Sequence, residues 1–334
     1  MNKKISVLYG CNDPYAPFVG VSICSLLENN KLADEIDIYV MSDGISEDNI
    51  LRIKKQIQSY GAGRYLKIVD SASIIEGFKA TGVPDYRGSY AAFLRLAFEQ
   101  AVGEEVDKLL YLDSDTLVVG DLLPLFEIDL GDNYIGAVAD CLGDMVKPLI
   151  GFEKGDFYLN SGVLLINVPV WKRDNITRKI IDMIKEGKLT NPSGGDQEYI
   201  LYATKDKIKV LDPKYNLQPF HMGYSNKQYF KVYAKEGYYS EGVLENSVNN
   251  PVILHTFRYL GRFPFHKNNI HPAKTEFEKY KDLSQWADME SPTKEIPLFI
   301  KAEIALYHIL PRVLFLKIFR MVQTMVLKRT IMNF

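Results

Sequence analysis

The stretch KLLYLDSDTLVVGDL, residues 108–122, places two carboxylates directly after a short apolar run. Residues 109–112 have the length and composition of a buried strand, and Asp113 and Asp115 follow it. In an extended segment, side chains two apart point to the same side, so these carboxylates are expected to converge while Ser114 faces away. Ligand sites of open α/β sheets lie beyond the carboxyl ends of strands, where this pair sits. A divalent ion held there would neutralise a diphosphate leaving group.

Two other interpretations of this stretch remain open. The sequence Asp-Ser-Asp-Thr is also good turn chemistry. It further approximates the DxDx[TV] pattern of haloacid dehalogenase-type phosphatases, whose first Asp accepts a phosphoryl group and whose second Asp is a general acid. Against the phosphatase, Leu117 stands where that pattern has Thr or Val, and the motif lies far from the chain start. No later acidic pair following a strand completes a magnesium site.

Composition indicates an ordinary globular protein. The 334 residues are 47% hydrophobic and carry a formal charge of -2, so one large domain or two smaller ones are expected and nucleic acid is not an expected partner. The odd number of cysteines, Cys11, Cys24 and Cys141, shows no zinc-type spacing and indicates reduced structural thiols. The start MNKKISVLYG lacks the apolar core of a signal peptide, which favours the cytoplasm.

Strands alternate with helices along most of the chain. Strands are predicted at 4–9, 36–41, 66–69, 109–112, 134–139, 161–168 and 251–254. Helices are predicted at 18–27, after a cap at Ser46, at 90–101 and at 171–186. This alternation predicts an α/β sheet with helices on both faces. The tyrosine-rich stretch 215–244 is weakly periodic and is expected to form surface loops and short strands.

The C-terminal segment is basic and apolar. Residues 296–334 contain six basic residues and the single acid Glu303, and the apolar runs after Pro311 are too interrupted for a spanning helix. The periodicity predicts a basic amphipathic helix. We expect it to lie on an anionic membrane surface at the inner face of the plasma membrane; docking on the protein's own core is the alternative.

Five motifs occur in an order that matches a known family. They are the opening loop GCNDPY, the acid pair, LNSGVLLINV, SGGDQEYIL and VILHTF. Over residues 4–265 the chain resembles family 8 glycosyltransferases, in particular bacterial lipopolysaccharide α-galactosyl- and α-glucosyltransferases. The resemblance implies a GT-A, Rossmann-like α/β fold with a mostly helical C-terminal extension. It divides the chain into a catalytic domain, 1–272, with a donor half to about 125 and an acceptor half from 126, and a helical membrane-association region, 273–334.

The resemblance also implies a UDP-sugar donor and a divalent metal. Asp113, Asp115 and His255 are the implied metal ligands, and this mixed set favours Mn2+ over Mg2+. The implied nucleotide-binding residues are Gly10, Asn12, Asp13, Tyr15, Arg95, Ser114, Gly261 and Arg262. Family members continue after the histidine with HxxGxxKPW, whereas this chain has HTFRYLGRFPFH, so Arg262 or Arg258 must replace the lysine that reaches the diphosphate.

The implied catalytic residues contact the donor sugar. They are Asp140, Asn160, Asp196 and Gln197, with Gln197 closest to the anomeric carbon. Taken alone, each of these residues has a structural alternative as a cap or turn residue, and His255 one as a core histidine. The implied reaction is retaining transfer of galactose or glucose to a saccharide or glycolipid hydroxyl. A binding module that keeps the fold without turnover is the non-enzymatic alternative.

Overall fold

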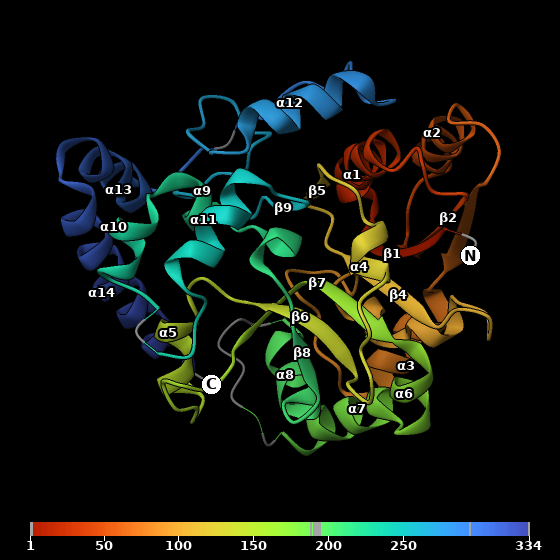
Figure 1. The fold of residues 1–334 in the computed structure, drawn as a ribbon, viewed down its shortest axis with the longest axis horizontal. Coiled ribbons are helices and arrows are strands. Elements are labelled where there is room, and N and C mark those ends of the chain that lie inside the picture. The colour runs from red at the N-terminus through yellow and green to blue at the C-terminus, as the bar shows by residue number, and fades with distance from the viewer. Residues whose placement is uncertain (1–2, 188, 190–194, 235, 294, 333–334) are drawn as a thin grey trace.

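The computed structural model describes residues 3–187, 189, 195–234, 236–293 and 295–332 (Figure 1). Its main sheet is built from β1 (Lys4–Asn12), β2 (Glu35–Asp43), β3 (Arg64–Asp70), β4 (Lys108–Leu112), β6 (Ile135–Ala139), β7 (Leu159–Asn167) and β8 (Ile208–Val210). The strand order is β3-β2-β1-β4-β7-β6-β8. β1 pairs in parallel with β2 and β4, whereas β7 is antiparallel to β4 and β6. The expected α/β sheet is confirmed as a mixed sheet.

Both faces of the sheet are covered, which explains why its inner strands β1, β4, β6 and β7 are buried on both sides, whereas the edge strands β3 and β8 are partly exposed. Val7 on β1 faces a core with α1 (Ala16–Asn29) and α2 (Glu47–Gln58). Its neighbour Leu8 faces a second core on the other side. That core is completed by α3 (Ala72–Thr81), α6 (Val168–Arg173), α7 (Ile176–Glu186) and α8 (Gln197–Thr204).

A small second sheet lies beyond the carboxyl end of β4. It pairs β5 (Thr116–Val118) antiparallel to β9 (Ile253–His255), with Thr116 opposite His255. The backbone N–H of Thr256 donates to the carbonyl of Asp115 at 2.7 Å. This pairing brings a histidine from late in the chain to the acid pair.

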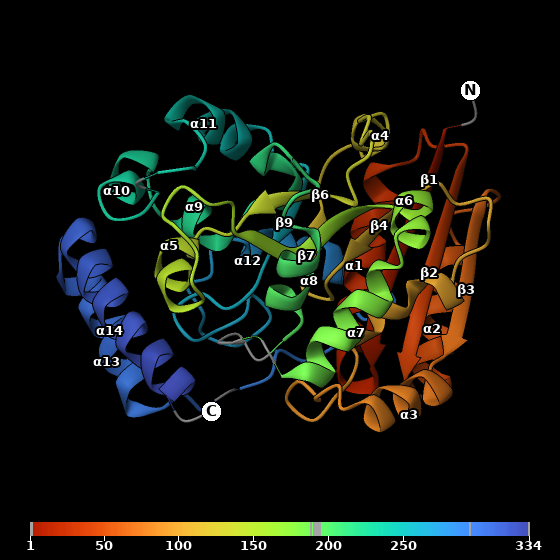
Figure 2. The same ribbon diagram turned by 90° about the horizontal axis from the view of Figure 1, so that it is seen from below.

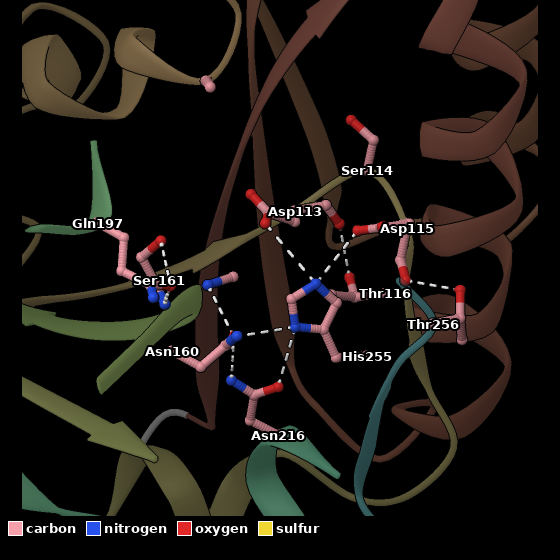
Figure 3. A network of polar contacts seen from close by, with 12 residues as sticks. Asp113, Ser114, Asp115, Thr116, Asn160, Ser161, Gln197, Asn216, His255 and Thr256 are labelled. Carbon is pink, nitrogen blue, oxygen red and sulfur yellow. Dashed lines mark hydrogen bonds and ion pairs between the residues drawn. The ribbon is translucent and has the colours of Figure 1, made fainter. Parts of the chain in front are cut away.

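The acid pair itself lies in a turn and not in an extended strand. β4 ends at Leu112, and the N–H of Thr116 donates to the carbonyl of Asp113 at 3.1 Å. The prediction that strand alternation aligns the carboxylates was therefore wrong. They converge because the chain reverses from β4 into β5, and Ser114 does point away from them (Figure 3).

Two predicted helices differ in form. The segment expected as a helix at 90–101 is a 3-10 helix, η2 (Phe93–Gln100), broken at Ala97. The backbone just before η2 packs closely on β1. A Cβ on Gly10 would lie 2.2 Å from the carbonyl oxygen of Ala91, so glycine is needed there. The helix expected at 171–186 is split into α6 and α7, because Asn175 between them adopts a left-handed φ of 52°.

The middle segment, expected as loops and short strands, is mostly short helices. They are η4 (Pro213–Asn216), α9 (Pro219–Gly223), α10 (Asn226–Phe230) and α11 (Glu241–Asn249). Ser225 and Gln228 form a capping box and Ser240 caps α11, so hydrogen-bonding caps stabilise helices whose periodicity is weak. The remaining short elements are η1 (Asp13–Tyr15), α4 (Leu123–Phe126), α5 (Gly143–Val146) and η3 (Lys147–Leu149).

The C-terminal segment forms three helices, α12 (Lys274–Leu283), α13 (Leu298–Ile309) and α14 (Arg312–Met332). Figure 2 shows α13 and α14 side by side at the end of the molecule opposite β3. Phe315 and Leu316 of α14 are buried in a cluster with Phe220 and Tyr259, so part of this segment does dock on the protein's own core. None of the described helices combines the length and apolarity that crossing a bilayer requires.

Candidate functional site

A cavity of about 570 Å³ lies beyond the carboxyl ends of β1 and β4. Twelve of the residues predicted from the sequence line it: Gly10, Asn12, Tyr15, Arg95, Asp113, Ser114, Asp115, Asp140, Asn160, Asp196, Gln197 and His255. These residues come from separated segments of the chain, and the fold brings them to one surface. A polar cavity at this edge of an α/β sheet is the usual place for a ligand site.

The acid pair and His255 form the one group of potential metal ligands found among the described residues. The Nε2 atom of His255 lies 3.3 Å from Oδ1 of Asp115 and 3.7 Å from Oδ2 of Asp113 (Figure 3). One ligand atom from each residue lies within 4.8 Å of the others. A single ion of ordinary coordination distance fits between atoms so spaced.

The imidazole of His255 is fixed on the side away from the acid pair. Its Nδ1 lies 3.0 Å from Oδ1 of Asn160 and 3.2 Å from Oδ1 of Asn216. A Cβ on Gly162 would lie 2.1 Å from the ring, so only glycine leaves it room. Burial alone would lower the pKa of His255, but the carboxylates of Asp115, Asp113 and Asp140 together outweigh burial and raise it.

Arg95 is buried between two carboxylates of the cavity wall. Its Nη2 donates to Asp113 at 2.9 Å, its Nη1 donates to the carbonyl of Ser161 at 2.5 Å, and its guanidinium stacks on the Tyr111 ring. The hydroxyl of Tyr111 also donates to Asp113 at 2.7 Å. Arg95 therefore fixes the position of the acid pair as well as lining the cavity.

Asp196 keeps an unused acceptor at the cavity. Its Oδ2 lies 2.8 Å from Nε of Arg95, but that N–H donates to the carbonyl of Ala92, so the contact is an ion pair without a hydrogen bond. Burial raises the pKa of Asp196 to about 6, although Arg95 opposes the shift. Asn12 likewise has a buried Oδ1 that no described residue hydrogen-bonds. Both atoms lack a hydrogen-bond donor among the described residues and are shielded from solvent, so a ligand reaches them only if neighbouring side chains shift.

The remaining wall is a fixed polar network. The N–H of Ser161 donates to Oε1 of Gln197 at 3.0 Å, and Nε2 of Gln197 donates to the hydroxyl of Tyr158 at 2.9 Å. Asn160 donates to Oδ2 of Asp140 at 2.9 Å, and desolvation raises the pKa of Asp140. Gln197 is thus held at both ends of its amide, in a defined orientation beside the cavity.

Three predicted nucleotide-binding residues lie outside the cavity lining. The carboxylate of Asp13 accepts hydrogen bonds from the N–H of Ser46 and from Asn49, which lower its pKa. Gly261 turns with φ of 73°, and Arg262 donates to the carbonyl of Lys267 at 2.6 Å.

The first two residues of the motif SGGDQEYIL, Ser193 and Gly194, lie outside the described residues.

The cavity has further lining residues that the sequence did not single out. Among them are Tyr86, Arg87, Tyr111, Phe257 and Phe263. A tyrosine inside the apolar run before the acid pair was a usable signal, because its hydroxyl needs a partner. Arg258, named as an alternative to Arg262, does line the cavity; it is exposed and lies over the Phe263 ring.

Comparison with known proteins identifies the family. The family model described as "Glycosyl transferase family 8" matches residues 6–259, more than half of the chain, and the protein belongs to that family. It is a glycosyltransferase of a retaining family.

Similar proteins are found among bacteria. The chain is 24% identical to General stress protein A of Bacillus subtilis over 291 residues, 84% of this chain and 94% of that one. It is 25% identical to the lipopolysaccharide 1,3-galactosyltransferase of Salmonella typhimurium, covering 85% of this chain and 80% of the relative. The match to glycosyltransferase GlyE of Streptococcus pneumoniae, 32% identical, spans 65% of this chain but about half, 48%, of GlyE.

Solved structures support the fold. The galactosyltransferase LgtC, in complex with donor and acceptor sugar analogs, superposes with a TM-score of 0.67 at 23% identity, covering 89% of this chain and 99% of LgtC. The bifunctional glycosyltransferase WbbM superposes with a TM-score of 0.68 at 19% identity, covering 86% of this chain and 51% of WbbM. The fold is therefore the expected α/β GT-A-like fold with C-terminal helices.

Proposed function

We propose that this glycosyltransferase moves a hexose from a UDP-sugar to a hydroxyl of a saccharide acceptor, with Mn2+ bound by Asp113, Asp115 and His255. The observation that carries the proposal is the convergence of these three side chains at a cavity beyond the carboxyl ends of the sheet strands. The donor half, 1–125, and the acceptor half, 126–272, are taken as the two sides of this cavity.

The donor set fits a divalent cation. Two carboxylates and one imidazole suit Mn2+ better than Mg2+, which prefers oxygen ligands alone. When bound, the ion supplies positive charge that stabilises the departing diphosphate. The carboxylate of Asp115 has fewer competing contacts than that of Asp113. Among the described residues it forms an ion pair with His255 alone, whereas Asp113 also forms one with Arg95.

The nucleotide is assigned to the wall formed by β1 and the segment after β9. The free Oδ1 of Asn12 is placed to accept from the base, and the exposed ring of Tyr15 offers a stacking surface for uracil. Arg258 is the proposed cation for the diphosphate. It is exposed at the cavity and forms no ion pair with a described residue, whereas Arg95 is already neutralised by Asp113 and Asp196.

The sugar is assigned to the wall of Asp140, Asn160, Asp196 and Gln197. Asp196 lies in this wall beside Arg95, and the carboxamide of Gln197, fixed at both ends, is the group we assign to the side of the reacting carbon. A carboxamide is a poor covalent nucleophile. We therefore propose front-face transfer: the bond from the anomeric carbon to UDP breaks, the bond to the acceptor oxygen forms on the same face, and UDP takes the acceptor proton. A glycosyl adduct trapped on Gln197 or Asp196 would overturn this mechanism.

Galactose or glucose is the proposed hexose, and a glycolipid or saccharide of the cell surface is the proposed acceptor. This rests on similarity to the lipopolysaccharide 1,3-galactosyltransferase of Salmonella typhimurium and the 1,2-glucosyltransferase of Escherichia coli. A glycolipid acceptor agrees with a peripheral position at the inner face of the plasma membrane. The exposed apolar side chains of α13 and α14, with Lys301, Lys317 and Lys328 among them, support contact with an anionic bilayer surface.

The proposal is tested by incubating the purified protein with UDP-galactose or UDP-glucose, with and without Mn2+, and measuring release of UDP. Slow metal-dependent hydrolysis without acceptor, accelerated by a saccharide acceptor, is the expected result. Binding of UDP without any turnover would favour the non-catalytic binding module. Release of phosphate from phosphomonoesters would revive the phosphatase reading, in which Asp113 must be a free nucleophile although Arg95 and Tyr111 both bond its carboxylate.

A further inference from the structure

Asn216 is a buried polar residue that neither the sequence nor the cavity lining points to. Its side chain is fully buried at the end of η4. The backbone that follows is tied to β9: the N–H of Leu217 donates to the carbonyl of Ile253 at 2.8 Å, and the N–H of His255 donates to the carbonyl of Leu217 at 2.9 Å. This pairing fixes the side chain of Asn216 next to the imidazole of His255.

The orientation of each amide in the network follows from groups that only donate or only accept. The backbone N–H of Gly162 donates to Asn160 at 3.1 Å, so the facing atom of Asn160 is its oxygen. The other end of that amide donates to the carboxylate of Asp140. Asn216 meets the same oxygen of Asn160 at 2.9 Å and must present its NH2 group there, which leaves its own oxygen facing His255.

This arrangement selects one tautomer of the imidazole. Nδ1 of His255 faces two oxygens, Oδ1 of Asn160 and Oδ1 of Asn216, so it must carry the hydrogen (Figure 3). The other nitrogen, Nε2, is then the atom with a free lone pair, and it points at Asp115 and Asp113.

Asn160 alone cannot hold the imidazole in this tautomer, and Asn216 supplies a second acceptor. Oδ1 of Asn160 already faces three donors, from Gly162, Asn216 and His255, whereas a carbonyl oxygen has two lone pairs. The oxygen of Asn216 gives the imidazole N–H a second acceptor. Asn216 is also absent from the cavity lining, so it acts on the site through His255 and Asn160 and not by touching substrate.

We infer that Asn216 is a positioning residue, which holds His255 in its Nδ1–H tautomer with Nε2 directed at the acid pair for the divalent cation. This inference rests on the proposed metal-ligand role of His255. Residues behind a metal-bound histidine typically contribute about 10- to 100-fold to metal affinity.

The test compares Mn2+ affinity in variants of the full chain, measured as free Mn2+ by electron paramagnetic resonance with excess UDP. Asn216→Leu removes both polar ends and is expected to weaken Mn2+ binding about 10- to 100-fold. Asn216→Asp keeps an acceptor for the Nδ1 hydrogen and is expected to recover most of that loss. Thermal unfolding without metal is measured on each variant, because a packing defect would lower stability without this order of affinities.

Asn30→Leu is the matched control. Asn30 is also buried, donates to the carbonyl of Leu26 and accepts from the N–H of Leu122, and does not line the cavity. It is expected to cost stability and leave Mn2+ affinity unchanged. If Asn216→Leu does not fold, Asn216→Ser, too short to reach the imidazole, takes its place with the same expected loss.

Three outcomes would contradict the inference, and they separate a failure of the positioning role from a failure of the metal site. Wild-type affinity in folded Asn216→Leu, or equal losses in the Leu and Asp variants, would refute the positioning role while leaving the metal site intact. Absence of Mn2+ binding to the wild-type protein with UDP would refute the proposed metal site itself, and the inference with it.

Discussion

The cavity wall buries charged side chains, whereas the hairpin of α13 and α14 exposes apolar ones. In the wall, charged groups are buried and paired: Arg95 is 5% exposed and bridges two carboxylates. In the hairpin, apolar groups stay in solvent: Leu298 is 82% exposed and Ile309 is 76% exposed. The wall is organised before any ligand arrives, whereas the hairpin presents an apolar surface that the chain's own core does not cover. The predictions below test each side of this contrast.

The largest effect is expected at the metal ligands. His255→Ala removes the imidazole that faces both carboxylates. Loss of a residue that only supports a metal ligand typically costs about 10- to 100-fold, so we expect loss of the ligand itself to reduce transferase activity with Mn2+ by more than about 100-fold. The loss is measured from initial rates of transfer at a series of Mn2+ concentrations. Activity close to that of the wild type at ordinary Mn2+ concentration would exclude His255 as a ligand.

A large effect is also expected from one methyl group behind that ligand. In Gly162→Ala the new Cβ would lie 2.1 Å from the His255 ring, so the ring must move away from the acid pair. We expect Mn2+ affinity to fall about 10- to 100-fold, measured by the same resonance experiment. The control is Gly77→Ala in α3, where a Cβ meets nothing within 4 Å and should raise stability slightly. Equal Mn2+ affinity in both variants would show that the wall tolerates displacement.

A moderate effect is expected at the exposed cation of the cavity. Arg258→Ala removes a charge-assisted contact to the diphosphate, and the KM for the UDP-sugar should rise about 10-fold or more. Arg262→Ala is the matched control, because that side chain bonds the Lys267 carbonyl outside the cavity lining. If the second substitution raises KM and the first does not, the diphosphate contact was assigned to the wrong arginine.

The smallest effect concerns the hairpin. Replacing Phe299 and Ile309 together by Ser should reduce co-sedimentation with vesicles of anionic lipid about 5-fold, because a helix that lies at the membrane interface buries its apolar side chains only in part. Rates on a soluble acceptor should not change. Leu32→Ser is the control, since Leu32 is 77% exposed but follows α1, outside the hairpin. If the double variant binds vesicles as well as the wild type does, the exposed surface of α13 and α14 does not bind the membrane.

The sequence predicted the sheet because its strands are buried on both faces and read as apolar runs. It did not predict the short helices after Asp212, since their caps, Ser225 and Ser240, stabilise segments without helical periodicity. The turn between β4 and β5 was one of the alternatives that Asp-Ser-Asp-Thr left open, but its geometry was not predicted, because it depends on pairing with a strand far along the chain.

The site was predictable where a motif carries it and not where packing does. The acid pair is visible in the sequence, and the motif order brought His255 to it. Nothing local indicates that Asn216 lies behind His255, because the two meet only through the pairing of Leu217 with β9. The resemblance marked Arg95 as a nucleotide-binding residue, but its burial between Asp113 and Asp196 could not be predicted, because it depends on how three separated segments pack.

The central claim is that the turn after β4 and the histidine ending β9 hold a cation that binds a nucleoside diphosphate. Calorimetry of UDP binding with and without Mn2+, on the wild type and on Asp115→Asn, tests it directly. The account predicts UDP binding that requires Mn2+ and is lost in the variant, whose fold should persist because Asp113 still pairs with Arg95. UDP binding of equal strength without the metal, or in the variant, would contradict it.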